Sequence, residues 1–187
     1  MRKSSSIIKL GLVGAFLAVG FSGCANKVAA YSTSTDNLIV IKGLSKNNKP
    51  VNLGEFTDSN REESKVMCRL TTPIGTPDGE TFASYIQNAL QKELLIGDMY
   101  DKTSDTKLSM NLDDIYGSTV LGNAYWEFKT TVNSSNGKSF KIESRYDYES
   151  SYFASSACSE MQRSFVPAVQ KLLGKVVGNS EFKNLLN

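Results

Sequence analysis

Gly137-Lys138-Ser139 has the residue types that end a phosphate-binding loop. Such a loop follows the pattern G-x-x-x-x-G-K-[ST] between a strand and a helix, so that backbone amides surround the phosphates. Here Val132 occupies the position of the first glycine, and the residues after Ser139, FKIESRYDYE, alternate as they would in a strand. The pattern therefore favours the corner of a hairpin, and we expect no nucleotide to bind.

The turn residues also predict the register of that hairpin. A two-residue Asn136-Gly137 turn would place polar residues opposite apolar ones, whereas a three-residue loop with positive φ at Gly137 gathers apolar residues on one face. A shift by two residues keeps the apolar face but sets Glu127 opposite Asp147, so charge selects the three-residue loop. The predicted pairs are Val132 with Phe140, Thr130 with Ile142, Trp126 with Tyr146, Glu127 with Arg145, and Lys129 with Glu143.

Other residue types that could perform catalysis are few. The chain contains no histidine, which excludes Ser-His-Asp and Cys-His catalysis and metal sites that use histidine. Residues 104–107 and 135–138 both read S-x-x-K, but they lie in predicted turns without the companion motifs of penicillin-binding proteins and β-lactamases. Asp113 and Asp114 are adjacent on a predicted strand and should point to opposite faces. We predict no catalytic residue, no metal site and no cofactor.

An aromatic group follows the hairpin. Tyr148, Tyr152 and Phe153 could stack on a glycan or contact a partner protein. Alternate aromatic residues on a strand more often pack within the sheet, so both interpretations stay open. We take these three as possible partner-binding residues.

Residues 1–23 read as a bacterial lipoprotein signal peptide. Basic residues precede an apolar run from Leu10 to Phe21, which is shorter than the roughly 20 residues of a membrane span. Phe21-Ser22-Gly23-Cys24 then resembles the lipobox, whose cysteine is acylated and becomes the N-terminus, with phenylalanine in place of the usual leucine. Cleavage after Val28-Ala29-Ala30 is the alternative. Because no aspartate follows Cys24, we expect a lipid-anchored protein of the outer membrane that faces the periplasm.

The other two cysteines are expected to pair. In an oxidising periplasm Cys68 and Cys158 favour one disulfide, and two buried free thiols are the alternative. A zinc site is a weaker interpretation, because two distant cysteines fall short of four ligands. Loss of residues 1–23 removes three of the 21 basic residues and none of the 19 acidic ones, which leaves a net charge of −1. Such a chain offers no electrostatic basis for binding nucleic acid.

The mature chain is predicted to hold one domain. Residues 24–36 are small and polar, which is typical of a flexible tether, and residues 37–187 would form the domain. The expected strands are Asn37–Gly43, Val66–Thr72, a strand around Leu108–Leu112 and the two strands of the hairpin, with a surface loop over residues 44–63. One helix should begin after Thr76-Pro77 and end at Gly97, and another should run over residues 154–177, with Pro167 inside it and Gly178 after it.

Several segments together resemble a group of uncharacterised bacterial outer-membrane lipoproteins, broadly YajG-like in layout. They are the lipobox, Cys68-Arg69, TFASYIQNALQKEL, WEFKTTVNSSNGKSF, Ala157-Cys158 and PAVQKLL. The resemblance implies an envelope-facing α+β domain in which an antiparallel sheet of about five strands has two helices packed on one face. It implies no activity and no catalytic residue.

From these observations we expect a non-catalytic envelope lipoprotein. It would contact the bilayer through acylated Cys24 and would bind or stabilise an envelope protein or a glycan. One alternative is a periplasmic hydrolase of cell wall or lipid, whose carboxylates converge only in the folded chain. Another is a surface-exposed, adhesin-like lipoprotein.

Overall fold

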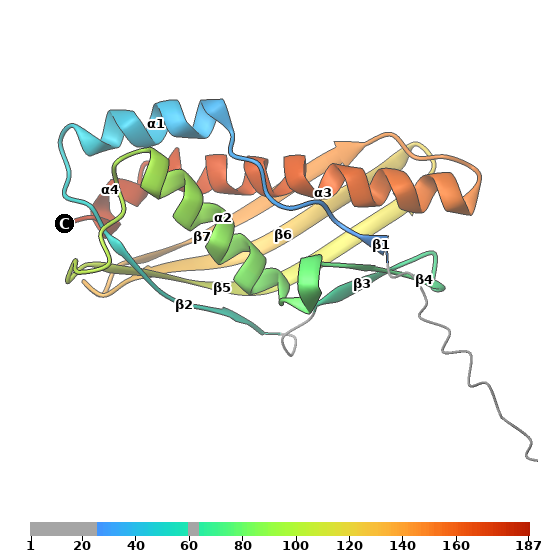
Figure 1. Cartoon of the computed structure of the whole chain (residues 1–187), viewed down its shortest axis with the longest axis horizontal. Helices are drawn as coiled ribbons and strands as arrows, with labels where there is room; N and C mark the ends of the chain where they lie inside the picture. The colour runs from blue at the N-terminus through green and yellow to red at the C-terminus, as the bar shows by residue number, and fades with distance from the viewer. Residues whose placement is uncertain (1–25, 60–63) are drawn as a thin grey trace, which may run out of the picture.

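A four-stranded mixed sheet with helices on one face forms most of the structure, a computed structural model that describes residues 26–59 and 64–187 (Figure 1). The signal peptide and the predicted lipidation site Cys24 lie outside the described residues. The sheet has the order β2-β5-β6-β7. Its strands are β2 (Asn52–Asp58), β5 (Lys107–Val120), β6 (Asn123–Ser134) and β7 (Ser139–Tyr148), with β2 parallel to β5 and the other neighbours antiparallel.

A second, smaller sheet lies beside the first. It has the order β1-β4-β3, with β1 (Asn26–Lys27) parallel to β4 (Thr72–Gly75), and β3 (Lys65–Cys68) antiparallel to β4. The class is therefore α+β, as expected, but the expected single antiparallel sheet of about five strands is replaced by one mixed sheet and one small sheet. The described residues also include the short helices η1 (Pro77–Gly79) and α4 (Phe182–Leu185).

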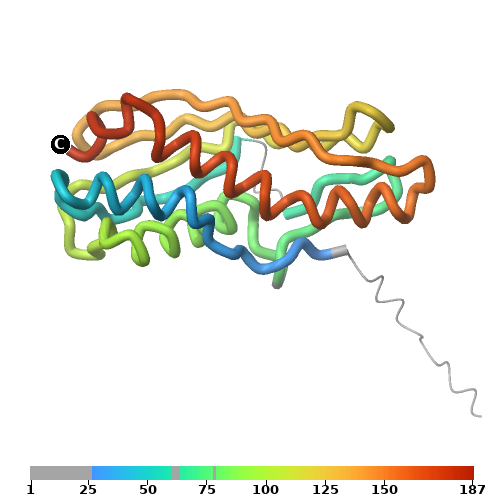
Figure 2. Tube along the Cα trace, turned by 90° about the horizontal axis from the view of Figure 1, so that it is seen from above, coloured from blue at the N-terminus to red at the C-terminus, as the bar shows by residue number. Residues whose placement is uncertain are grey.

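Helices α2 (Phe82–Ile96) and α3 (Ala154–Val177) pack on one face of the large sheet, and α1 (Thr35–Ser45) lies against both of them (Figure 1, Figure 2). In β6 the even-numbered residues from Ala124 to Ser134 are buried, so this face of the sheet meets the helices. The indole of Trp126 lies 5.0 Å from the ring of Phe165 and donates to the carbonyl of Met161 at 3.0 Å. A single core thus joins α3 to the centre of the sheet.

Strand β5 contains a bulge at Asp113. Leu112 pairs with Thr130 and Asp114 with Lys129, so Asp113 is an extra residue in the ladder. The bulge shifts the alternation by one residue, and Ile115 therefore remains on the buried face. It also places Asp113 and Asp114 on the same, outer face, which corrects the expectation that they point apart.

The N-terminal part of the domain differs from the prediction. Residues 37–43, expected as a strand, lie within α1, whose first turn is capped by the Ser34 hydroxyl. Asn37, Ile41 and Leu44 repeat at helical spacing and are buried. Within the expected tether, Val28 and Tyr31 are also buried, so residues 26–36 lie on the domain. The expected loop over residues 44–63 contains β2.

Other boundaries agree with the prediction more closely. Helix α2 begins after Thr81, whose hydroxyl accepts from the Ser84 amide, rather than after Thr76, which precedes η1. Helix α3 runs continuously through Pro167 and ends at Gly178, as expected. Glu181 occupies the N-cap position of the short helix α4.

The hairpin has the predicted register in full. Val132 pairs with Phe140, Trp126 with Tyr146, and Glu127 with Arg145. Ser134 and Lys138 close the three-residue loop, in which Gly137 has a φ of 85°. The expected ion pairs across the strands are replaced by pairs along them, because Lys129 lies 3.6 Å from Glu127 and Arg145 lies 2.8 Å from Asp147.

Candidate functional site

Exposed apolar side chains gather at one end of the molecule, which we call the apolar tip. They come from the β3–β4 turn, the β5–β6 turn and the β7–α3 connection, which meet at the same end in both views (Figure 1, Figure 2). Large exposed apolar side chains are normal singly, but a contiguous group marks a contact surface. The tip consists of Leu70 (90% exposed), Val120 (62%), Leu121 (60%), Tyr152 (80%) and Phe153 (71%).

The backbone that presents Leu70 is strained. Arg69 and Leu70 have φ values of 47° and 64°, and the Thr71 amide donates to the Cys68 carbonyl across them. Asn and Gly normally occupy such a turn, because other residues lose about 1–2 kcal/mol each in the left-handed region. Holding a leucine in this conformation with its side chain in solvent costs free energy. Strained residues of this kind cluster at functional sites.

Two cross-links hold this turn against the start of α3. The Arg69 guanidinium donates to the carbonyls of Ser151 and Tyr152, at 2.6 and 2.8 Å. The predicted disulfide is confirmed: Cys68 and Cys158 are joined with a Cα–Cα distance of 5.7 Å. Leu70 and the pair Tyr152 and Phe153 are therefore fixed relative to one another.

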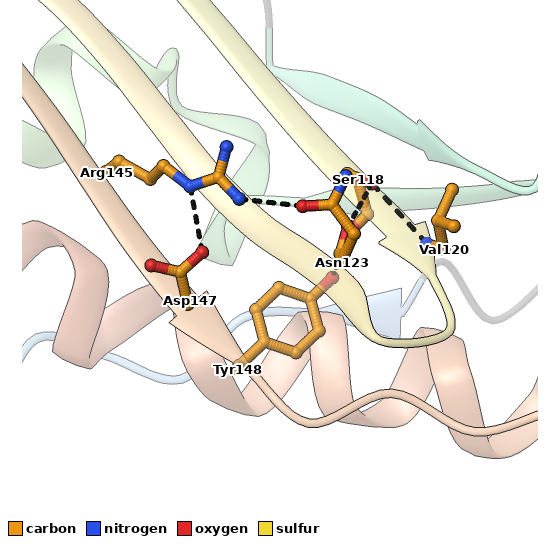
Figure 3. Close-up of polar contacts among 6 residues, drawn as sticks. All are labelled: Ser118, Val120, Asn123, Arg145, Asp147 and Tyr148. Carbon is orange, nitrogen blue, oxygen red and sulfur yellow. Dashed lines mark hydrogen bonds and ion pairs between the residues drawn. The ribbon is translucent and has the colours of Figure 1, made fainter.

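The β5–β6 turn is attached to the same connection. The Tyr148 hydroxyl donates to the Ser118 carbonyl at 2.7 Å (Figure 3). Ser150 Oγ donates to the Thr119 carbonyl at 2.9 Å. Within the turn, Ser118 Oγ contacts both the Asn123 carbonyl and the Val120 amide. Burial raises the pKa of the Tyr148 phenol, so it remains a hydrogen-bond donor at alkaline pH values at which an exposed phenol would begin to ionise.

A polar group, which we call the outer-face cluster, adjoins the tip on the face of the sheet that α2 and α3 leave open. Arg145 donates to Asp147 and to Asn123, both at 2.8 Å (Figure 3). Its guanidinium lies 3.5 Å from the ring centroid of Tyr125. Tyr125 in turn contacts Tyr116, with ring centroids 5.8 Å apart. These five residues form the cluster. A groove of about 600 Å³ next to it is lined by Leu121, Gly122, Asn123, Ala124, Arg145, Asp147, Tyr148, Glu149 and Ser150.

The three predicted partner-binding aromatic residues have different roles. Tyr152 and Phe153 are exposed and form an edge-to-face pair with centroids 5.9 Å apart, so they stand at the tip. Tyr148 is half-buried, and its hydroxyl is used to hold the β5–β6 turn. Sequence reasoning missed Leu70, Val120 and Leu121, because each is apolar within its own turn and only the fold brings them together.

The remaining sequence candidates have structural explanations. Lys138 is exposed in the hairpin loop, its amide bound by Asn136 Oδ1, and a strand follows it where a phosphate loop requires a helix. Both oxygens of Asp113 accept hydrogen bonds on the outer face, from Thr131 and from Asn111. Over residues 26–59 and 64–187, no group of three or more His, Cys, Asp or Glu residues could hold a metal ion.

Sequence reasoning also missed a buried polar cluster around Glu93. Its side chain is fully buried, and Oε1 accepts from Tyr31 Oη, Ser34 N and Asn37 Nδ2. A hollow of about 380 Å³ lies nearby, lined in part by Tyr31 and Tyr85. The Tyr31 hydroxyl already donates to Glu93, and the Tyr85 hydroxyl already donates to the Ala29 carbonyl. The hollow therefore lies where the N-terminal segment packs against α2, and its two phenols serve that packing.

No model of a known protein family matches this chain, and no curated protein does. Among the described helices, none has both the length and the apolar character that a membrane span requires.

Proposed function

We propose that this chain is a non-catalytic lipoprotein of the YajG-like kind, anchored to the outer membrane by acylated Cys24 and facing the periplasm. Its role would be to bind or stabilise an envelope protein through the outer-face cluster. The leader and the lipobox-like residues before position 25 support the anchor. The Cys68–Cys158 disulfide supports an oxidising compartment.

The outer-face cluster is the observation that carries the partner-binding role. Arginine and tyrosine are enriched among the residues that contribute most to protein interfaces. Here Arg145 is pre-oriented by Asp147, Asn123 and the face of Tyr125, so little side-chain freedom remains to be lost on binding. Tyr116, half of whose surface is exposed, extends the cluster along the sheet.

Fractionation of a Cys24→Ser variant tests the anchor. If acyl chains on Cys24 hold the protein at the membrane, the variant should leave the membrane fraction. An unchanged membrane fraction would contradict the lipoprotein assignment.

A photo-crosslinking residue at Tyr116 tests the partner. In intact envelopes it should give a discrete protein adduct that is lost on Arg145→Ala. The matched control is Arg163→Ala, which removes an exposed arginine from α3. An adduct equally strong in both variants, or no adduct at all, would rule out this surface.

A further inference from the structure

We infer that the apolar tip rests on the bilayer that carries the anchor. This inference deepens the proposed function and depends on acylation of Cys24. Its first support is the composition of the tip, where leucine, valine and phenylalanine accompany an exposed tyrosine. Apolar side chains of this kind enter the acyl boundary of a membrane, and tyrosine prefers the headgroup level.

The second support is the distance from the anchor. Cys24 precedes Asn26 by two residues, so their Cα atoms can be at most about 7 Å apart in any conformation. Asn26 is paired with Ile74 in β4, which is four residues, or at most about 14 Å of chain, from Leu70. The acyl chains must therefore leave the protein close to the tip.

The third support is the direction of the chain. Strand β1 runs parallel to β4, and β4 leads away from the β3–β4 turn. Going from Asn26 toward the N-terminus, the direction of β1 therefore points to the β3–β4 turn, which holds Leu70.

The fixed geometry of the tip suits this role. Its three segments are joined by the disulfide, by Arg69 and by Ser150, so the apolar side chains are held in solvent without the freedom to fold back. Acyl chains on one cysteine attach the domain to the bilayer but leave it free to turn about that point, and a second contact fixes its orientation. The tip would supply that second contact.

Tryptophan fluorescence of the acylated full-length chain tests the inference. The chain has one tryptophan, Trp126, and it is fully buried, so it gives a constant background. We would place a second tryptophan at the tip with Tyr152→Trp, or on the outer face with Tyr116→Trp as the matched control. Each protein is reconstituted into vesicles of phosphatidylethanolamine and phosphatidylglycerol that contain brominated lipids, which quench a nearby indole.

The expected result is at least twofold stronger quenching, with a blue-shifted emission maximum, for Tyr152→Trp than for Tyr116→Trp. Adding Leu70→Asp and Phe153→Asp to the Tyr152→Trp variant should abolish the difference, while an unchanged thermal unfolding midpoint shows that the fold persists. Equal quenching of the two probes in anchored protein would overturn this inference alone. A blue shift of the tip probe in native envelopes but not in vesicles would also overturn it, because a protein would then cover the tip.

Failure of the anchor gives a different result. Protein that does not float with the vesicles, and whose N-terminal peptide lacks the acyl mass, would overturn the proposed lipoprotein function and this inference with it.

Discussion

Tyr31 and Glu93 join the N-terminal segment to α2 through a buried hydrogen bond of 2.5 Å. The Ser34 amide and the Asn37 side chain donate to the same Glu93 oxygen, and Asn37 also donates to the Gln170 carbonyl in α3. A single carboxyl group thus gathers the chain before α1, α1 itself and α2. This network fixes residues 31–37 on the domain, where the sequence predicted a flexible tether as far as residue 36.

Replacing Glu93 should be costly. Glu93→Ala would leave the buried Tyr31 hydroxyl without an acceptor and remove one acceptor each from the Ser34 amide and the Asn37 side chain, and we expect a loss of about 3 kcal/mol in unfolding free energy. Glu93→Gln keeps the accepting oxygen and should lose about 1–2 kcal/mol. Urea unfolding measures both, with the exposed Glu55→Ala on β2 as the control. Equal effects of Glu93→Ala and Glu55→Ala would contradict the role of the network.

Alkaline pH should destabilise the fold in a way that Tyr31 controls. Burial, then the hydrogen bond with Glu93 and the charge of Glu93, raise the pKa of Tyr31 above its ordinary value. The unfolded chain therefore loses its tyrosine protons first, at about pH 10, so stability is full below that pH and falls as pH rises. Tyr31→Phe should make the fall above pH 10 shallower in urea unfolding measured from pH 8 to 12. An identical slope in the variant would refute this prediction.

Loss of the disulfide should weaken the whole domain. The bridge spans 90 residues, and the chain-entropy estimate for such a loop is about 4–5 kcal/mol as an upper value. We expect the Cys68→Ser, Cys158→Ser double variant to unfold at a lower urea concentration, and the wild type to match it after reduction. If reduction leaves the wild-type midpoint unchanged, the bridge contributes nothing measurable.

The hairpin loop should be sensitive at Gly137 and tolerant at Lys138. Gly137→Val forces a β-branched residue to a φ of 85°, which we expect to lower the unfolding free energy by about 1–3 kcal/mol. Lys138→Ala changes an exposed side chain and should alter it by less than about 0.5 kcal/mol. Thermal unfolding of the two variants side by side gives the comparison. A larger loss for Lys138→Ala would mean that its side chain has a role beyond the turn.

The hairpin shows what could be predicted from the sequence. Its strands are neighbours in the chain, and the alternation around Trp126 and Val132, with Gly137 at the turn, contains all the information that the register needs. The ion pairs of the hairpin, in contrast, differ from the predicted ones. Arg145 lies opposite Glu127 but turns to Asp147 and to the Tyr125 ring, because an exposed ion pair is weak enough for local packing to decide its partner.

Helix α1 shows why other parts could not be predicted. Its run Ile39-Val40-Ile41 favours a strand by intrinsic preference, and the tertiary structure overrides that preference. Ile41 packs against Gly97, where an added Cβ would lie 2.3 Å from Ile41 Cγ2. That contact joins residues far apart in the sequence. Leu70, Val120 and Leu121 of the tip escaped prediction for the same reason, since only the fold brings their two turns to the predicted pair Tyr152 and Phe153.

The bulge at Asp113 has a consequence for how chains of this kind can be aligned. Leu112 and Ile115 both face the core with Asp113 and Asp114 between them, so a chain one residue shorter here would recover plain alternation. Removing a residue anywhere else in the body of β5 would reverse the phase of the strand and turn its apolar side chains toward water. A one-residue gap at this position is therefore neutral for the core, and a relative that differs here in length can share the same fold.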